Sequence, residues 1–80
     1  MNTELTPGED AVGKSFNPAQ DPKVDELKTL FAKAFDIVEQ HVKADDGTNE
    51  TARLRKLRDA ALHEIVSAQM WAVKVVTKGL

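Results

Sequence analysis

Apolar residues recur every three or four positions in two long stretches of the chain, the spacing that is typical of amphipathic helices. The first stretch begins at Pro22 and ends at about Lys43. Its stripe consists of Val24, Leu27, Phe31, Ala34, Val38 and Val42, widened by Leu30, Phe35 and Ile37. The second extends from about Asn49 to Thr77, with a predicted seam toward the first helix of Leu54, Leu57, Ala61, Ile65, Ala68, Ala72 and Val75. The pattern therefore predicts an all-α fold.

The residues that flank these stretches are typical helix boundaries. Asp21 offers a side-chain acceptor as N-cap, and Pro22 suits the first helical position because its missing N–H costs nothing there. Gly47 tolerates a positive φ and ends the first helix, and Thr48 or Asn49 caps the second. The short connection predicts two antiparallel helices.

Residues 1–20 show no helical period and are predicted to form a flexible N-terminal arm before an αα-hairpin over residues 21–80. Residues 8–15 of the arm read GEDAVGKS, which fits the phosphate-binding loop of nucleotide triphosphatases. That loop needs a buried strand before it and a helix that starts at Lys14. Only MNTELTP precedes the match and SFNPAQDP follows it closely, so neither element forms. We interpret the match as a coincidence.

The second half of the second stretch is apolar nearly all round, so one partner helix cannot cover it. Met70, Trp71 and Val75 are predicted to contact other subunits, with Trp71 as the anchor. A chain of 80 residues buries only about 60% of its unfolded surface. Oligomerisation is therefore the expected way to complete the core.

Composition indicates one soluble domain without disulfides. The chain has no cysteine and a formal net charge of −2, and it has no apolar run long enough to cross a membrane. Its first residues lack the apolar segment of a signal peptide. We expect a cytosolic protein that binds neither a membrane nor polymeric DNA or RNA.

No cluster of side chains supports catalysis or metal binding. His63-Glu64 begins like a zinc-protease helix, but Ser67 stands where the second His ligand is required. His41 and His63 lie on separate helices without a third ligand, and Ser15 and Ser67 lack an identifiable base. The sequence therefore predicts no catalytic residue, no metal and no cofactor.

A basic cluster at the start of the second helix is one candidate for ligand binding. It contains Arg53, Arg55, Lys56 and Arg58. Guanidinium groups suit bidentate phosphate contacts, so the cluster favours a small anion. The alternative is a solvated charged face.

The segment SFNP is the second candidate. It presents Phe16, Asn17 and Pro18 without a helical pattern, and an aromatic ring beside an amide is suited to stacking on a base and reading it. The alternative is that Phe16 packs the arm onto the hairpin. Both interpretations stay open from the residues alone.

SFNP, together with the helical segment AALHEIVSAQMWAVKVV, resembles the phage anti-CBASS sponges of the second type and their hairpin relatives among anti-Thoeris proteins. In that family a [Thr or Ser]-aromatic-[Asn or His]-Pro segment precedes the first helix, and the second helix contains A-L-T-x-L-E-x-A-x-M-W-A. The residues that match the second motif are Ala61, Leu62, Ile65, Ala68, Met70, Trp71 and Ala72. His63 replaces the Thr, and Val66-Ser67 replaces the acidic pair.

The resemblance implies a compact homo-hexamer that sequesters cyclic oligonucleotides without cleaving them, in the cytoplasm of an infected bacterial host. It implies that Phe16, in the segment that also holds Pro18, stacks on a base of a cyclic dinucleotide such as cyclic GMP–AMP. A lysine early in the first helix binds the phosphates, and both Lys23 and Lys28 are candidates. Asn17 is expected to face a cyclic trinucleotide.

The trinucleotide-binding arginine of this family is expected among Arg53, Arg55 and Arg58. Such a protein blocks CBASS defence by binding alone, so the resemblance implies no enzyme. An alternative function of another class is a helical adaptor or oligomerisation module that binds a host protein through the Trp71 surface.

Overall fold

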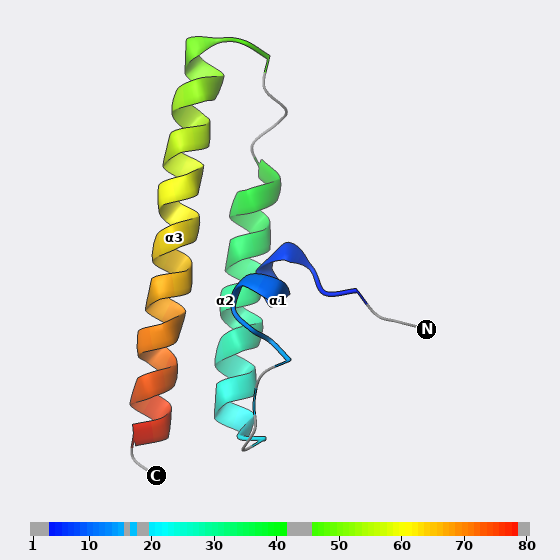
Figure 1. Ribbon diagram of the computed structural model, residues 1–80, viewed down its shortest axis with the longest axis vertical. Helices are drawn as coiled ribbons and strands as arrows, with labels where there is room; N and C mark the ends of the chain where they lie inside the picture. The colour runs from blue at the N-terminus through cyan, green and yellow to red at the C-terminus, as the bar shows by residue number, and fades with distance from the viewer. Residues whose placement is uncertain (1–3, 16, 18–19, 42–45, 79–80) are drawn as a thin grey trace.

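The computed structural model describes residues 4–15, 17, 20–41 and 46–78. These residues form helices α1 (Pro7–Ala11), α2 (Pro22–His41) and α3 (Asn49–Lys78). No strand occurs among the described residues, which confirms the predicted all-α fold. In Figure 1, α3 lies beside α2 and α1 lies against α2, and both contacts are extensive. No helix within the described ranges is long and apolar enough to cross a membrane.

Both long helices start with the predicted caps. Oδ1 of Asp21 accepts a hydrogen bond of 2.9 Å from the N–H of Lys23. Oγ1 of Thr48 accepts one of 3.1 Å from the N–H of Thr51, and Gly47 adopts a φ of 81°. Each side chain satisfies a backbone donor that the first turn of a helix leaves without an intrahelical acceptor.

Helix α1 is not among the elements predicted from the sequence. A capping box starts it: Oγ1 of Thr6 accepts from the N–H of Glu9 at 3.1 Å, and the N–H of Thr6 donates to Oε1 of Glu9 at 3.0 Å. Pro7 occupies the first helical position. Because an isolated helix of this length is unstable in water, its packing against α2 must hold it.

Gly8 makes the closest contact between α1 and α2. Its N–H donates to Oδ1 of Asp36 at 2.7 Å, and its Cα lies against the carbonyl oxygen of Ala32 with no room for a Cβ. The carboxylate of Asp36 therefore sits at the N-terminus of α1, where a negative charge is favourable. Val12 follows α1 and is only 4% exposed.

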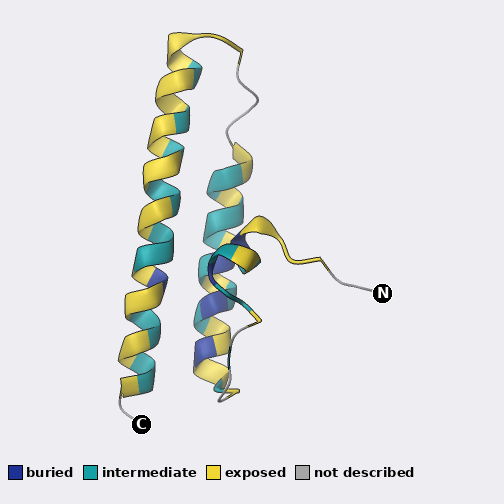
Figure 2. Ribbon diagram, in the orientation of Figure 1, coloured by how far each residue is buried: buried dark blue, intermediate teal, exposed yellow. Residues whose placement is uncertain are grey.

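The predicted register of α3 against α2 is wrong for several residues. Leu54, Leu57 and Val75 were expected to face α2, yet they are 46%, 67% and 75% exposed. The buried and half-buried residues of α3 include Arg55, Arg58, Leu62, Ile65, Val66, Gln69, Ala72, Val73 and Val76. In Figure 2, exposed residues follow the side of α3 that points away from α2. Because much of α3 is apolar nearly all round, its period alone does not select the face that packs on α2.

The core is small for an 80-residue chain. Among the described residues, Val12, Val24 and Ala32 are the buried apolar ones, and Lys28 and Gln69 are buried with them. The chain extends over 49 × 33 × 13 Å, so the molecule is a thin plate. A plate of this kind leaves apolar side chains of both long helices in contact with solvent.

Candidate functional site

Two lysine side chains hold the segment that follows α1. Nζ of Lys14 donates to Oδ1 of Asp25 at 2.6 Å, and Nζ of Lys28 donates to the carbonyl oxygen of Gly13 at 2.9 Å. Asp25 and Lys28 lie one turn apart on α2, so one stretch of this helix contacts both residues. Gly13 has a φ of 66°, a conformation that favours glycine.

The two ammonium groups influence each other. Lys28 is only 5% exposed, and burial lowers its pKa. The positive charge of Lys14 lowers the pKa of Lys28 further. An anion that bound beside Lys28 would oppose both effects, because a negative charge favours the charged form of this lysine.

A polar hollow of about 470 Å³ opens beside Lys14. It is lined by Lys14, Ser15, Asn17, Gln20, Asp21, Pro22 and Asp25. Among the described residues, its wall contains one ammonium group, two carboxylates, two amides and a hydroxyl, and no large apolar side chain. The amides, the hydroxyl and the carboxylates are suited to the base edges and sugar hydroxyls of a nucleotide. The ammonium group of Lys14, which Asp25 pairs, is the group in this wall that suits a phosphate.

Asn17 closes the loop before α2. Its Nδ2 donates to the carbonyl oxygen of Asp21 at 3.0 Å, and its Oδ1 accepts from the N–H of Asp21 at 3.1 Å. An amide group has two N–H donors and two acceptor lone pairs, so Asn17 keeps one N–H and one lone pair for further hydrogen bonds. Asn17 can therefore contact a ligand while it keeps both hydrogen bonds to Asp21.

The candidates for the dinucleotide occupy different places. Neither lysine lines the hollow, but Lys28 contacts the loop through the carbonyl oxygen of Gly13, whereas Lys23 is exposed. Phe16 and Pro18 lie outside the described residues. Of the two lysines left open by the sequence, Lys28 is the one that contacts the segment after α1, through Gly13.

The basic cluster lies at the far end of α2 from this hollow. Figure 1 shows that α3 starts near the end of α2, while the hollow is at the start of α2. Arg53 is exposed, and Arg55 and Arg58 are half-buried. Nε and Nη2 of Arg58 donate to Oδ1 of Asp59 at 3.2 and 3.0 Å. Within one chain, the arginines and Asn17 are therefore not brought together.

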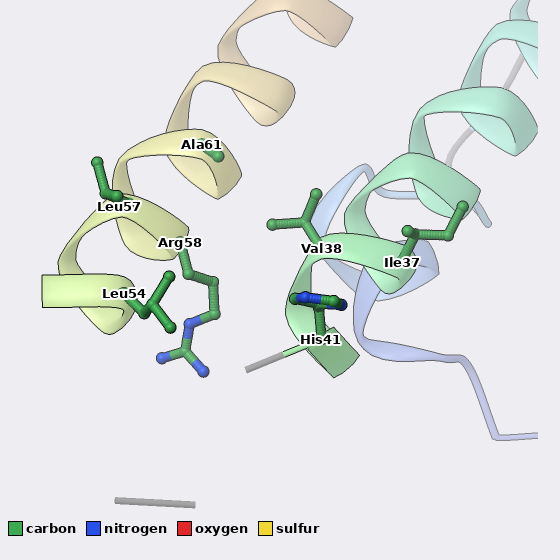
Figure 3. A pocket seen from close by; sticks show the side chains of 7 residues that line it. All are labelled: Ile37, Val38, His41, Leu54, Leu57, Arg58 and Ala61. Carbon is green, nitrogen blue, oxygen red and sulfur yellow. The ribbon is translucent and has the colours of Figure 1, made fainter. Parts of the chain in front are cut away.

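Arg58 also lines a shallow groove between α2 and α3 (Figure 3). The groove has a volume of about 300 Å³ and is lined by Ile37, Val38, His41, Leu54, Leu57, Arg58 and Ala61. Its lining is mainly aliphatic, with the guanidinium and the imidazole as its polar groups. Sequence reasoning did not predict this groove, because it depends on the register between the two helices.

The predicted interface residues on α3 are exposed. Trp71 is 65% exposed, Met70 58% and Val75 75%. Nζ of Lys74 lies 4.9 Å from the centroid of the Trp71 ring, a cation–π contact. Contact with other subunits remains a prediction for these residues.

Lys14 and Asp25 were missed as site residues. The sequence offered a signal for Lys14 only through the rejected GEDAVGKS match, and Asp25 lies eleven positions further along the chain. Within the part of the chain that the structure describes, no three His, Cys, Asp or Glu side chains are grouped to hold a metal.

Comparisons of the chain with protein-family models, with curated proteins and with solved structures found no match. The functional assignment therefore depends on the sequence motifs and on the site geometry.

Proposed function

We propose that this protein binds and sequesters cyclic oligonucleotides without degrading them, as a phage protein that blocks CBASS defence in the cytoplasm of its bacterial host. The observation that carries the proposal is the pair of ammonium groups of Lys14 and Lys28, which hold the segment that follows α1 through Asp25 and Gly13. Phosphates of a cyclic dinucleotide bind between these groups, and Phe16 stacks on a base. Sequestration needs stacking, phosphate contacts and enough protein to lower the free ligand, but no general base or metal.

The finer architecture belongs to the same proposal. The helices over residues 21–80 act as an αα-hairpin, and the hairpins assemble into a compact homo-hexamer. Assembly is supported by the thin plate and by the exposed apolar residues of α3, since one chain buries little of its own apolar surface. A second ligand class, the cyclic trinucleotides, uses Asn17 and the arginines of α3 from different chains.

Recovery of the nucleotide after binding tests this function. The protein is mixed with cyclic GMP–AMP, separated from free nucleotide and denatured by heat, and the released nucleotide is identified by chromatography. Intact cyclic GMP–AMP is expected. Linear products would establish an enzyme, and no retention of any cyclic di- or trinucleotide in a panel would refute the proposal.

Two substitutions locate the site. Lys14→Gln removes one charge-assisted phosphate contact, which corresponds to a loss of affinity of about tenfold. Lys33→Gln is the matched control, because Lys33 is an exposed lysine of α2 that does not line the hollow. Phe16→Ala is expected to abolish dinucleotide binding while the mass in solution stays unchanged. Equal affinities for the two lysine variants would place the phosphates elsewhere.

A second candidate function is a helical adaptor that binds a host protein through Trp71. It is favoured by the exposure of Trp71 and its neighbours on α3. The adaptor needs no ligand at SFNP, so failure to bind every cyclic oligonucleotide, with retention of a host protein that Trp71→Ala releases, would favour it.

A further inference from the structure

The hollow beside Lys14 has an excess of negative charge. Its described lining contains one ammonium group, that of Lys14, and the two carboxylates of Asp21 and Asp25. Nζ of Lys14 already pairs with Oδ1 of Asp25 at 2.6 Å, so the carboxylate of Asp21 is the charge that remains. An anionic group inside the hollow would meet repulsion, whereas a neutral group with N–H donors would not. The hollow therefore suits the base of a nucleotide better than its phosphates.

Both carboxylates of the hollow keep an oxygen for a ligand. Oδ1 of Asp21 accepts from the N–H of Lys23 at 2.9 Å, and Oδ1 of Asp25 accepts from Lys14. Among the described residues, neither Oδ2 atom has a hydrogen-bond partner. Asp21 is occupied as the cap of α2, whereas Asp25 lies one turn further along the helix with a side chain that is 55% exposed. Asp25 is therefore the carboxylate that a ligand reaches.

The donor pattern of guanine matches this lining. A carboxylate accepts two parallel hydrogen bonds, and guanine alone among the common bases presents two adjacent donors, N1–H and the N2 amine, on its Watson–Crick edge. Adenine presents the N6 amine beside the lone pair of N1, which a carboxylate repels. Guanine also presents O6 next to N1–H, and the side-chain amide of Gln20, which lines the hollow, has N–H donors for this oxygen.

The ribose is a poorer match for Asp25. A sugar engages both oxygens of a carboxylate through two adjacent hydroxyl groups. In a 3′,5′-linked cyclic dinucleotide the O3′ atom belongs to the phosphodiester, so each ribose keeps only its 2′-hydroxyl. A paired contact with the carboxylate therefore comes from a base.

The hollow also lies next to the other parts of the proposed site. Ser15 and Asn17, the neighbours of Phe16 in the chain, both line it. Lys14 lines it as well and makes a proposed phosphate contact. Because Asp25 contacts Lys14 directly, a nucleotide whose phosphate binds Lys14 has a base within reach of Asp25.

We propose that Asp25 selects guanine in the bound cyclic dinucleotide, by accepting hydrogen bonds from N1–H and the N2 amine of one base. This inference rests on the proposed function, because it names the base that the same site prefers. Asp25 thus holds Lys14 beside the phosphate and also reads the base. Cyclic di-GMP and cyclic GMP–AMP are therefore bound more tightly than cyclic di-AMP.

Titration of the unmodified protein with three cyclic dinucleotides tests the choice of base. Affinities for cyclic di-GMP, cyclic di-IMP and cyclic di-AMP are measured by calorimetry in one buffer. Cyclic di-IMP keeps N1–H but lacks the N2 amine, so it isolates one of the two donors. We expect cyclic di-GMP to bind about tenfold more tightly than cyclic di-AMP, with cyclic di-IMP between them.

The titration separates failure of this inference from failure of the proposed function. Equal affinities, or a preference for cyclic di-AMP, would overturn the selection of guanine while sequestration stands. No binding of any of the three would overturn the inference together with the sequestration of dinucleotides.

Asp25→Asn and Glu26→Gln form a matched pair. Each change replaces an exposed carboxylate of α2 by its amide, but Glu26 does not line the hollow. Asp25→Asn puts N–H donors where the base needs an acceptor, so the ratio of the affinities for cyclic di-GMP and cyclic di-AMP is expected to fall about tenfold, toward one. Glu26→Gln should keep the ratio of the unmodified protein. An unchanged ratio in Asp25→Asn would overturn the assignment.

Lys14→Gln distinguishes selection of the base from placement of the lysine. It removes the ion pair with Asp25 and the proposed phosphate contact but leaves the carboxylate in place. Both nucleotides should therefore bind more weakly by a similar factor, with their ratio unchanged. An Asp25→Asn variant that shows this same pattern would mean that Asp25 acts only through Lys14. Circular dichroism checks that all three variants stay helical.

Discussion

Replacement of Gly8 by alanine is expected to detach α1 from α2. The new Cβ would overlap the carbonyl oxygen of Ala32 and lie 2.8 Å from Oδ1 of Asp36. The first atom belongs to the backbone of a long helix and cannot move away by a change of rotamer. Helix α1 must therefore shift outward, which breaks the 2.7 Å hydrogen bond between the N–H of Gly8 and Asp36.

The magnitude follows from what docking contributes. The hydrogen bond to a carboxylate stabilises the docked state by about 1.5–3 kcal/mol, and burial of Val12 adds about 1.5–3 kcal/mol. Overpacking costs about 1–3 kcal/mol, and the shift also loses the bond to Asp36. The two losses together are comparable with the whole docking energy, and α1 has too few residues to stay helical alone. We expect local unfolding around α1 with α2 and α3 intact.

Amide hydrogen exchange measures this directly. The N–H groups of Asp10, Val12 and Lys14 donate to backbone carbonyls at 2.9, 3.0 and 2.8 Å, and all three should lose protection in Gly8→Ala. Gly47→Ala is the control: a Cβ there meets no atom within 4 Å, so only the strain of its φ of 81° remains. Unchanged protection of the three amides in Gly8→Ala would refute the close contact.

Two pH responses are expected. Burial and the charge of Lys14 lower the pKa of Lys28 while α1 is docked. Between this lowered pKa and the ordinary value of about 10.4, the undocked state binds more protons than the docked state. Docking of α1 is therefore expected to strengthen as the pH rises through this range. Lys28→Met should abolish this trend in the amide exchange of α1. Hydrogen bonds with Thr51 and Thr48 lower the pKa of Asp46 to about 2. The bonds that Thr48 donates to Asp46 should therefore weaken as the pH falls from about 4 toward 2, which loosens the start of α3. Asp46→Asn should remove that acid response when exchange at Thr51 is followed.

The starts of α2 and α3 were predictable because local side chains determine them, whereas α2 ends at His41, before the predicted end at about Lys43. Asp21 and Thr48 bond to backbone donors two and three positions away, and Gly47 provides the positive φ between the helices. Helix α1 also has a local signal, the capping box of Thr6 and Glu9. It was missed because so short a helix has no apolar period and depends on Asp36, which is 28 positions from Gly8.

The register of α3 and the lysine pair were not predictable from local patterns. Two stripes of α3 have similar apolar content, and the choice between them depends on how α2 presents its own side chains. Lys14 and Asp25 are joined across eleven positions by the fold of the loop. The exposure of Leu57 and Ile37 is therefore a finding of the structure.

The proposed homo-hexamer has a consequence for the proposed site. Asn17 bonds to Asp21 at the start of α2, and Arg53 lies at the start of α3, near the other end of α2 (Figure 1). Twenty helical residues separate these ends by about 30 Å. In the proposed homo-hexamer, the arginine that completes a site with Asn17 therefore comes from a second copy.

A subunit-mixing experiment tests whether one trinucleotide site uses both chains. Asn17→Ala and Arg53→Ala are each expected to lose cyclic trinucleotide binding while self-association stays unchanged. A mixture of the two variants should regain part of that binding, because a mixed pair contains one site with both side chains intact. A site built within one chain predicts no recovery, since every chain of the mixture lacks one of the two side chains. Arg55→Ala and Arg58→Ala, mixed in the same way, identify which arginine completes the site.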